Sequence, residues 1–172
     1  MKREFSAGGV VFRKPSKLGT QFSIEWLVAK SSPNKVFPND YWSLPKGWLD
    51  DIQQGREPGP LASGKKKAIE EEIRSAAIRE VKEEGGVGVK IIKKLGSEKY
   101  FFTFEGERIL KFVTFYLMEW TNDLPEGPGF ETETVEWLSY DKARKKLSNS
   151  LEKKVLDKAK VELDSGLQQK LV

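Results

Sequence analysis

The sequence predicts a single α/β domain, residues 1–172, in which helices cover both faces of a mixed β-sheet. Segments with the composition of strands lie both before and after one central amphipathic helix, and two further helical segments close the chain. With 172 residues, of which 38% are hydrophobic, the chain is long enough to bury a sizeable core within one domain.

The N-terminal part contains two predicted strands that are rich in β-branched and aromatic residues. Gly8-Gly9 in the first strand indicates a bulge or a close backbone approach. Pro15 to Thr20 is expected to form a loop, and the prolines and asparagines between Ser31 and Asp40 predict another. The strands cover residues 5–13 and 22–29, and a short extended segment that turns at Pro45 and Gly47 covers 41–48.

Residues 50–67 are polar and rich in glycine and proline, and we expect them to form a mobile loop. The central helix is predicted over residues 68–84, followed by two glycines that stop it. Ile73, Ala77 and Val81 recur at i,i+4 spacing and predict the stripe that faces the core.

The C-terminal half is predicted to hold four strands and then two helices. Gly106 indicates a hairpin turn, and the prolines and glycines of residues 122–129 indicate a loop. The strands cover residues 87–92, 98–104, 109–120 and 132–138, and the helices cover 140–147 and 151–163.

The chain contains neither cysteine nor histidine. This composition excludes disulfides, thiolate nucleophiles, Ser-His-Asp triads, histidine general bases and Cys/His zinc sites. A metal site would have to use oxygen ligands, which favours Mg²⁺ or Mn²⁺. The formal net charge of +4 favours anionic substrates but is too small to indicate a nucleic-acid-binding protein by itself.

No apolar run of about 18 residues exists, so we expect no membrane span. The first five residues, Met1–Phe5, include an acid and no long apolar stretch, so we do not expect a signal peptide. The expected location is the cytoplasm.

Three carboxylates crowd the end of the predicted central helix. Glu80 and Glu84 are like charges at i,i+4, which costs an isolated helix about 0.2–0.5 kcal/mol, and Glu83 lies beside both. On a helical wheel, Glu80 and Glu84 border the apolar stripe. A divalent cation among the oxygens would relieve this repulsion, so the trio is a candidate metal site for phosphate chemistry. The alternative is a solvated charged face.

One stretch of the chain consists of Glu71, seven further residues and then Arg79-Glu80-Val81-Lys82-Glu83-Glu84-Gly85-Gly86-Val87. It resembles most of the Nudix box, G-x5-E-x7-R-E-U-x-E-E-x-G-U, in which U is aliphatic. Every fixed position from Glu71 onward matches, and Leu44-Pro45-Lys46-Gly47 resembles the segment that usually precedes the box. The likeness covers most of residues 5–147. It implies a Nudix-type α/β/α sandwich and hydrolysis of a nucleoside diphosphate linked to another moiety.

The resemblance also implies roles for the residues of the box. Glu80, Glu83 and Glu84 would bind one or more Mg²⁺ ions, with Mn²⁺ as an alternative, and one carboxylate would take a proton. Arg79 would hold the glutamates in position by bridging to Glu71 or Glu83. The expected catalytic residues are therefore Glu71, Arg79, Glu83 and Glu84.

One departure concerns the first glycine of the box. Gly47 is the plausible equivalent, but 23 residues separate it from Glu71 instead of five. The box is thus expected to contain an insertion of about 18 residues, at about 49–66. This insertion puts the usual geometry between Gly47 and Glu71 in doubt but leaves the metal-binding carboxylates untouched.

Further candidates lie outside the box. Many Nudix enzymes place an extra base or metal ligand on a loop near Glu131, so we add Glu131 to the catalytic set, with a plain surface acid as the alternative. Lys46 is either a phosphate contact or a solvated turn lysine.

A second pattern consists of Lys99-Tyr100-Phe101-Phe102, a glycine turn and then Arg108 to Lys111. It looks similar to the dinucleoside polyphosphate and diphosphoinositol polyphosphate branches of the family. This likeness implies that Lys99, Tyr100 and Lys111, with Lys46, bind substrate. The alternative is that the aromatic residues only build the core. A period of two places Lys99 and Tyr100 on opposite faces of the strand.

We therefore expect Mg²⁺-dependent hydrolysis of a pyrophosphate bond in a (di)nucleoside polyphosphate. The rival reactions are removal of the 5′-end pyrophosphate of RNA and, in another class, nucleotide sensing by a non-catalytic Nudix-like module. Intact box carboxylates argue against the module. The expected partner is a small nucleotide, with no membrane. A nucleic acid is the less favoured alternative and stays open, as does the oligomeric state.

Overall fold

The computed structural model describes residues 1–15 and 23–170, with side chains described up to residue 167. The predicted loop after Pro15 and the first residue of the predicted second strand lie outside this part. The elements are β1 (Lys2–Arg13), β2 (Glu25–Ser31), β3 (Trp42–Ser43), β4 (Lys46–Trp48), β5 (Asp51–Ile52), β6 (Glu57–Pro58), α1 (Glu70–Glu80), η1 (Val81–Gly85), β7 (Val87–Phe104), β8 (Glu107–Asp123), β9 (Thr132–Leu138), α2 (Tyr140–Lys146) and α3 (Ser150–Lys170).

Seven of the strands form one mixed sheet. Its order is β3-β2-β1-β8-β7, with β4 also paired to β1 and β9 also paired to β2. β1 and β8 run parallel along eleven residue pairs, whereas the other pairs of this sheet are antiparallel. The predicted mixed sheet is thus confirmed, and β1 lies at its centre.

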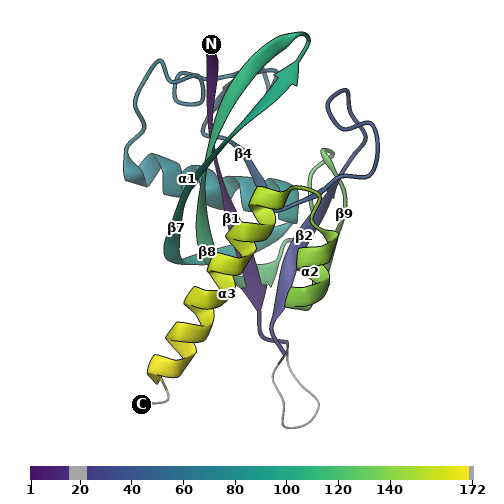
Figure 1. Ribbon diagram of the computed structural model, residues 1–172, viewed down its shortest axis with the longest axis vertical. Coiled ribbons are helices and arrows are strands. Elements are labelled where there is room, and N and C mark those ends of the chain that lie inside the picture. The colour runs from purple at the N-terminus through teal and green to yellow at the C-terminus, as the bar shows by residue number, and fades with distance from the viewer. Residues whose placement is uncertain (16–22, 171–172) are drawn as a thin grey trace.

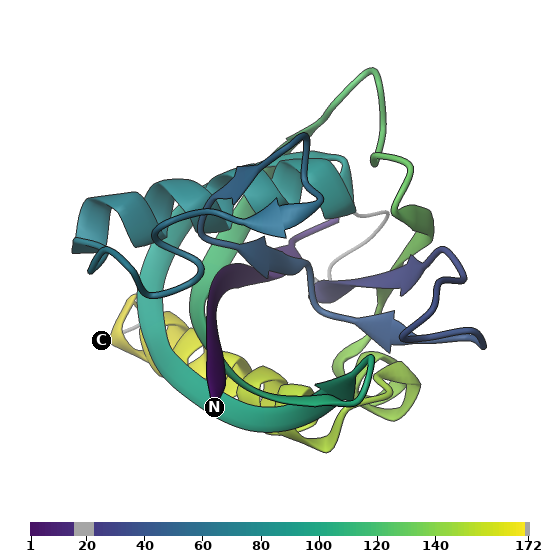
Figure 2. The ribbon, with the colours of Figure 1, turned by 90° about the horizontal axis from the view of Figure 1, so that it is seen from above.

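Helices cover both faces of this sheet, so the α/β fold is confirmed. Figure 2 shows α1 on one side of the curved sheet and α3 on the other, and Figure 1 shows α2 beside α3. Successive residues of a strand point to opposite faces. In β1, Val10 packs in the core under α2 and α3, and Val11 packs in the core under α1. In β8, Leu117 packs in the core under α2 and α3, and Tyr116 packs in the core under α1.

The strands at 87–92 and 98–104 were expected to be separate, but they form the single strand β7. Register shifts against β8 occur after Gly88, Ile91 and Lys94, and these irregularities let one long strand curve. The turn predicted at Gly106 is confirmed. Glu105 and Gly106 both have positive φ (50° and 79°), as a two-residue type I′ hairpin requires.

The central helix begins at Glu70, two residues later than expected, with the Glu72 carboxylate accepting a hydrogen bond from the Ile69 N–H. It continues past Glu80 as the π-helical turn η1 and ends at Gly86, whose φ is 70°. The predicted stripe is confirmed, because Ala77 and Val81 are fully buried and Ile73 packs against them. No helix in the described ranges is long and apolar enough to cross a membrane.

The segment between β4 and α1 contains more order than the sequence suggests. β5 and β6 form a small hairpin, and the Asp50 carboxylate accepts hydrogen bonds from the N–H groups of Leu61 and Ala62. Ala62 is fully buried, and its carbonyl accepts a hydrogen bond from the Phe5 N–H. The second half of the segment is therefore fixed against β1 and the core.

Candidate functional site

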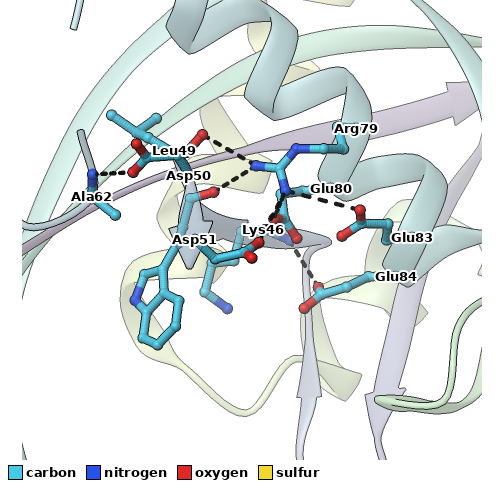
Figure 3. A network of polar contacts seen from close by, with 10 residues as sticks. Lys46, Leu49, Asp50, Asp51, Ala62, Arg79, Glu80, Glu83 and Glu84 are labelled. Carbon is cyan, nitrogen blue, oxygen red and sulfur yellow. Dashed lines mark hydrogen bonds and ion pairs between the residues drawn. The ribbon is translucent and has the colours of Figure 1, made fainter. Parts of the chain in front are cut away.

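Arg79 lies at the centre of a polar network at the end of α1 (Figure 3). Its Nη2 donates to the carbonyls of Trp48 (2.8 Å) and Leu49 (3.2 Å). Its Nη1 lies 3.1 Å from the Glu80 carboxylate and 3.9 Å from that of Glu83. The guanidinium thereby ties the segment after β4 to the acidic turn of the helix, as the predicted bridge to Glu83 requires.

Glu80 is buried against the backbone of Gly47 in β4. A Cβ atom at Gly47 would lie 2.1 Å from a carboxylate oxygen of Glu80, so the absence of a side chain at position 47 makes room for this carboxylate. Burial raises the pKa of Glu80 to about 8. The charge of Arg79 opposes this increase, and the neighbouring Glu84, Glu83 and Glu131 add to it more weakly.

Glu84, one turn further on, accepts a hydrogen bond of 2.9 Å from the N–H of Lys46 (Figure 3). Burial raises the pKa of Glu84 to about 7, although the Lys46 charge and this hydrogen bond both lower it, and Glu131 adds a further increase. Two carboxyl groups that titrate near neutral pH thus lie on adjacent turns, beside the same short strand.

The loop before β9 docks on this acidic turn. Gly129 donates its N–H to the Glu83 carbonyl (2.7 Å), and Leu124 donates to the Gly86 carbonyl (2.9 Å). Gly86 leaves no space for a Cβ, because the backbone of Pro128 lies 2.6 Å from that position. This docking explains why the exposed carboxylate of Glu131 lies close enough to influence Glu80 and Glu84.

The donor set of this turn fits a hard divalent cation. Glu80, Glu83 and Glu84 supply only oxygen ligands. Burial is the main cause of the raised pKa values of Glu80 and Glu84, and a bound cation would favour the charged form of both carboxyl groups. Within residues 1–15 and 23–170, however, no three acidic side chains are gathered closely enough to form a coordination shell. Glu80 instead pairs with Arg79, and Glu84 with the Lys46 amide.

Three of the four predicted substrate-binding residues share one face of the sheet. Tyr100 and Lys111 are a cross-strand pair of β7 and β8, and their side chains therefore point the same way. Both are electrostatically coupled to the Lys46 ammonium group. Burial lowers the pKa of Lys111, and the Lys46 charge lowers it further. Burial raises the pKa of Tyr100 to about 12.

Lys46 itself is largely buried, with 12% of its side chain exposed. Burial alone would lower its pKa, but the charge of Glu152 and, more weakly, that of Glu84 raise the pKa above the ordinary lysine value. Lys46 is thus held charged inside the protein, contrary to the alternative of a solvated turn lysine. Two buried cations close together are an environment for a bound polyanion.

Two predicted residues do not join this arrangement. Lys99 is exposed and pairs with Phe112, on the opposite face of β7 from Tyr100. Glu71 is exposed in the first turn of α1, about 12 Å along the helix axis from Arg79. In the described part of the chain, the contacts of Arg79 reach Asp51, Glu80 and Glu83 but not Glu71, so the predicted bridge to Glu71 is absent.

The sequence analysis missed Glu152 and Asp51. Glu152 is 3% exposed and accepts a hydrogen bond from the Leu44 N–H, whereas Asp51 lies 3.9 Å from Arg79. One signal could have identified Glu152, since it lies on the apolar stripe of α3 with Val155, Leu156 and Ala159. An acid in the buried stripe of an amphipathic helix requires a partner.

The chain is similar to known proteins both in sequence and in fold. The family model described as "NUDIX domain" matches residues 4–159. A Mycobacterium tuberculosis (strain CDC 1551 / Oshkosh) protein that carries the mutator-protein name MutT4 is 27% identical over 118 residues. The match includes 69% of this chain but 40% of that protein, so the chain spans less than half the length of this curated relative.

Solved structures share the fold. An Ap4A hydrolase of C. elegans in a binary complex has a TM-score of 0.61 at 23% identity, with 94% of this chain and 98% of that chain covered. A NUDIX hydrolase from Nitrosomonas europaea has a TM-score of 0.60 at 18% identity, with coverage of 94% and 90%. The NUDIX domain of Shewanella oneidensis NrtR, complexed with ADP ribose, has a TM-score of 0.56 at 10% identity, with coverage of 95% and 90%.

Proposed function

The chain belongs to the Nudix family, and we propose that it is a pyrophosphohydrolase that acts on a (di)nucleoside polyphosphate in a Mg²⁺-dependent reaction. The observation that carries this proposal is the position of two partly buried lysines, Lys46 and Lys111, whose charges both act on Glu84 of the acidic turn. Lys46 connects the acidic turn with the pair of lysines. Its N–H donates a hydrogen bond to Glu84, and the charge of its ammonium group lowers the pKa of Lys111.

The carboxylates of the turn support the metal part of the proposal. Glu80, Glu83 and Glu84 would hold the cation, and Glu131, whose charge raises the pKa of Glu80 and Glu84, is the candidate for a further ligand. A divalent cation bound there supplies charge for the pyrophosphate and lowers the pKa of a coordinated water. Arg79 keeps Glu80 and Glu83 on the same side of the turn.

The lysines support the polyphosphate part. The Lys46 charge lowers the pKa of Lys111, so each cation disfavours the other until an anion lies between or beside them. A chain of several phosphates would relieve this repulsion more completely than a single diphosphate does. Tyr100, paired with Lys111 across the strands, adds a hydroxyl and an aromatic face to the same side of the sheet.

A substrate panel tests the proposal. The purified protein with Mg²⁺ would be given diadenosine polyphosphates, nucleoside triphosphates, ADP-ribose and 5′-triphosphorylated RNA, with products separated by anion-exchange chromatography. We expect the highest kcat/KM for a dinucleoside polyphosphate. Faster turnover of the RNA would favour the rival reaction, and the absence of Mg²⁺-dependent turnover across the panel would favour a binding module.

The two faces of the β7–β8 hairpin offer a matched pair of variants. Lys111→Met removes a partly buried cation of the proposed site, and we expect it to raise KM for a polyphosphate by about tenfold or more. Lys99→Met removes an exposed cation of the neighbouring strand region and should leave KM close to its wild-type value. Equal effects of the two substitutions would argue against a substrate site on the face of Lys46, Tyr100 and Lys111.

A further inference from the structure

We propose that Glu152 of α3 is a positioning residue for the hydrolytic site, which it serves by holding the segment Leu44–Lys46 that in turn contacts Glu84. This inference rests on the proposed metal-dependent function. The contacts that carry it run from α3 through one short segment to the acidic turn on the other face of the sheet.

The first contact is made at the edge of the sheet. β3 is the last strand of the order, so the N–H groups that point away from β2 lack a neighbouring strand. Ser148 Oγ accepts from the Trp42 N–H (2.9 Å), and the Ser148 N–H donates to the Trp42 carbonyl (2.9 Å). Glu152 Oε1 accepts from the Leu44 N–H (2.6 Å). Ser148, just before α3, and Glu152, in its first turn, thus replace the missing strand.

The second contact is electrostatic. Glu152 Oε2 is buried, has no hydrogen-bond partner among the described residues, and lies 3.4 Å from the Lys46 ammonium group. A buried carboxylate is costly unless it is paired. The two oxygens of Glu152 therefore make different contacts. One accepts the hydrogen bond from the Leu44 N–H, and the other forms the ion pair with Lys46.

The segment between these contacts is stiff. Pro45, whose ring restricts φ, links Leu44 to Lys46, and its carbonyl accepts a hydrogen bond from the Gly9 N–H (3.0 Å). The next N–H, that of Lys46, donates to Glu84 (Figure 3). A shift of Leu44 would therefore move the donor that holds Glu84 as well as the ammonium group beside it.

Glutamine and alanine substitutions separate the two contacts. Glu152→Gln keeps an oxygen acceptor for Leu44 but removes the charge that faces Lys46, whereas Glu152→Ala removes both. Glu162→Gln is the control, because Glu162 lies on the same helix and pairs with Lys93 on the surface (2.7 Å). Mn²⁺ affinity of the substrate-free protein, measured by electron paramagnetic resonance, provides a readout that does not depend on turnover.

We expect Glu152→Ala to weaken Mn²⁺ binding by roughly tenfold and to lower kcat by roughly tenfold. Losses of this size are typical when a residue that orients metal ligands is replaced. Glu152→Gln should retain Mn²⁺ affinity but alter kcat/KM, and Glu162→Gln should change neither. In a double-mutant cycle, Glu152→Gln should have little further effect once Lys46→Met has removed its partner. If Glu152→Ala does not fold, this cycle and the Mn²⁺ affinity of Glu152→Gln decide the question.

Two results would overturn the inference. The first is a folded Glu152→Ala protein with wild-type Mn²⁺ affinity and kcat. The second is an effect of Glu152→Gln that remains undiminished when Lys46 is replaced. Failure of the proposed function would look different, because the wild-type protein itself would then show no Mg²⁺-dependent turnover on the panel.

Discussion

At the scale of single residues, the position of Glu80 depends on a side chain that is absent. The φ of Gly47 is not positive, so the backbone would accept alanine, but its methyl group would occupy the place of the Glu80 carboxylate. We expect Gly47→Ala to displace this carboxylate, with a loss of about 10²-fold in kcat, since misplacement of a catalytic group by about 1 Å can cost that much. Steady-state kinetics together with thermal unfolding measure both effects.

The folded state provides the check on this prediction. The nearest atoms to the new methyl group belong to the end of a flexible side chain, so Glu80 can rotate away and the protein should keep its fold. Wild-type kcat in a folded Gly47→Ala protein would show that the place of Glu80 against β4 is unimportant. A loss of the fold would show that the contact is mainly structural.

The two exposed glutamates of the box, Glu71 and Glu83, should differ in importance. Glu83→Gln should lower kcat strongly and leave the fold intact, because the change relieves repulsion within the acidic turn. Glu71→Gln should leave kcat close to wild type, because the Glu71 side chain is exposed and no contact of Arg79 in the described chain reaches it. Parallel kinetics of the two variants test this difference, and an equal loss in both would restore the usual role of Glu71.

The sequence could predict the acidic turn because its geometry is local. Spacings of three and four residues place Arg79, Glu80, Glu83 and Glu84 together on any helix. It could not predict Glu152 or Asp51 as partners, because those contacts depend on how distant segments meet. Similarly, the period of two separated Lys99 from Tyr100, but only the pairing of β7 with β8 shows that Tyr100 lies on the face of Lys46.

At the scale of elements, the segment between β4 and α1 acts as a brace for the site. Its composition predicts a loop, and turn residues do dominate it, but the sequence does not show that Asp50 bonds two N–H groups eleven and twelve residues later. Its first residues carry the Trp48 and Leu49 carbonyls that accept from Arg79. The anchoring of the segment and the orientation of Arg79 are therefore linked through adjacent residues.

Replacement of Asp50 tests this brace. Asp50→Ala would leave the Leu61 and Ala62 N–H groups without their acceptors, and each such loss costs about 1–3 kcal/mol when the group is buried. We expect a lower free energy of unfolding by about 2 kcal/mol in urea titrations, with a smaller loss for Asp50→Asn. Glu57→Ala, an exposed acid of the same segment, is the control and should change stability by less than about 0.5 kcal/mol. Equal stability of all three variants would contradict the brace.

At the scale of the whole molecule, the acidic turn and the Lys46–Glu152 ion pair lie on opposite faces of the sheet, and a strand of the sheet connects them. Glu80 and Glu84 belong to the helix that covers one face, whereas Lys46 extends toward Glu152 of the helix on the other face. β4 makes this connection, because Lys46 and Gly47 are neighbours whose side-chain directions alternate. Alternation of apolar residues predicted the two faces, but not that an acid from the last helix would reach the fourth strand.

Proton binding by the acidic turn should therefore be visible in the stability of the whole protein. The pKa values of Glu80 and Glu84 are about 8 and 7 in the folded state, above the ordinary value of 4.5 that applies when the chain is unfolded. Between these values the folded state binds more protons, so the free energy of unfolding falls as pH rises. The slope is at most about 1.4 kcal/mol per pH unit for each carboxyl group. Without metal, the protein should lose stability from about pH 5 to about pH 8.

Magnesium should reverse this loss, because its ligands must be deprotonated in order to bind it. Thermal unfolding with and without saturating Mg²⁺ at about pH 5.5 and about pH 8 measures the effect, and we expect the increase in Tm to be larger at the higher pH. A Glu80→Gln/Glu84→Gln protein removes both titrating groups, so its metal-free stability should fall less over this range and Mg²⁺ should add little. An equal Mg²⁺ effect in the wild-type and double-variant proteins would place the cation elsewhere and separate the stability of the turn from metal binding.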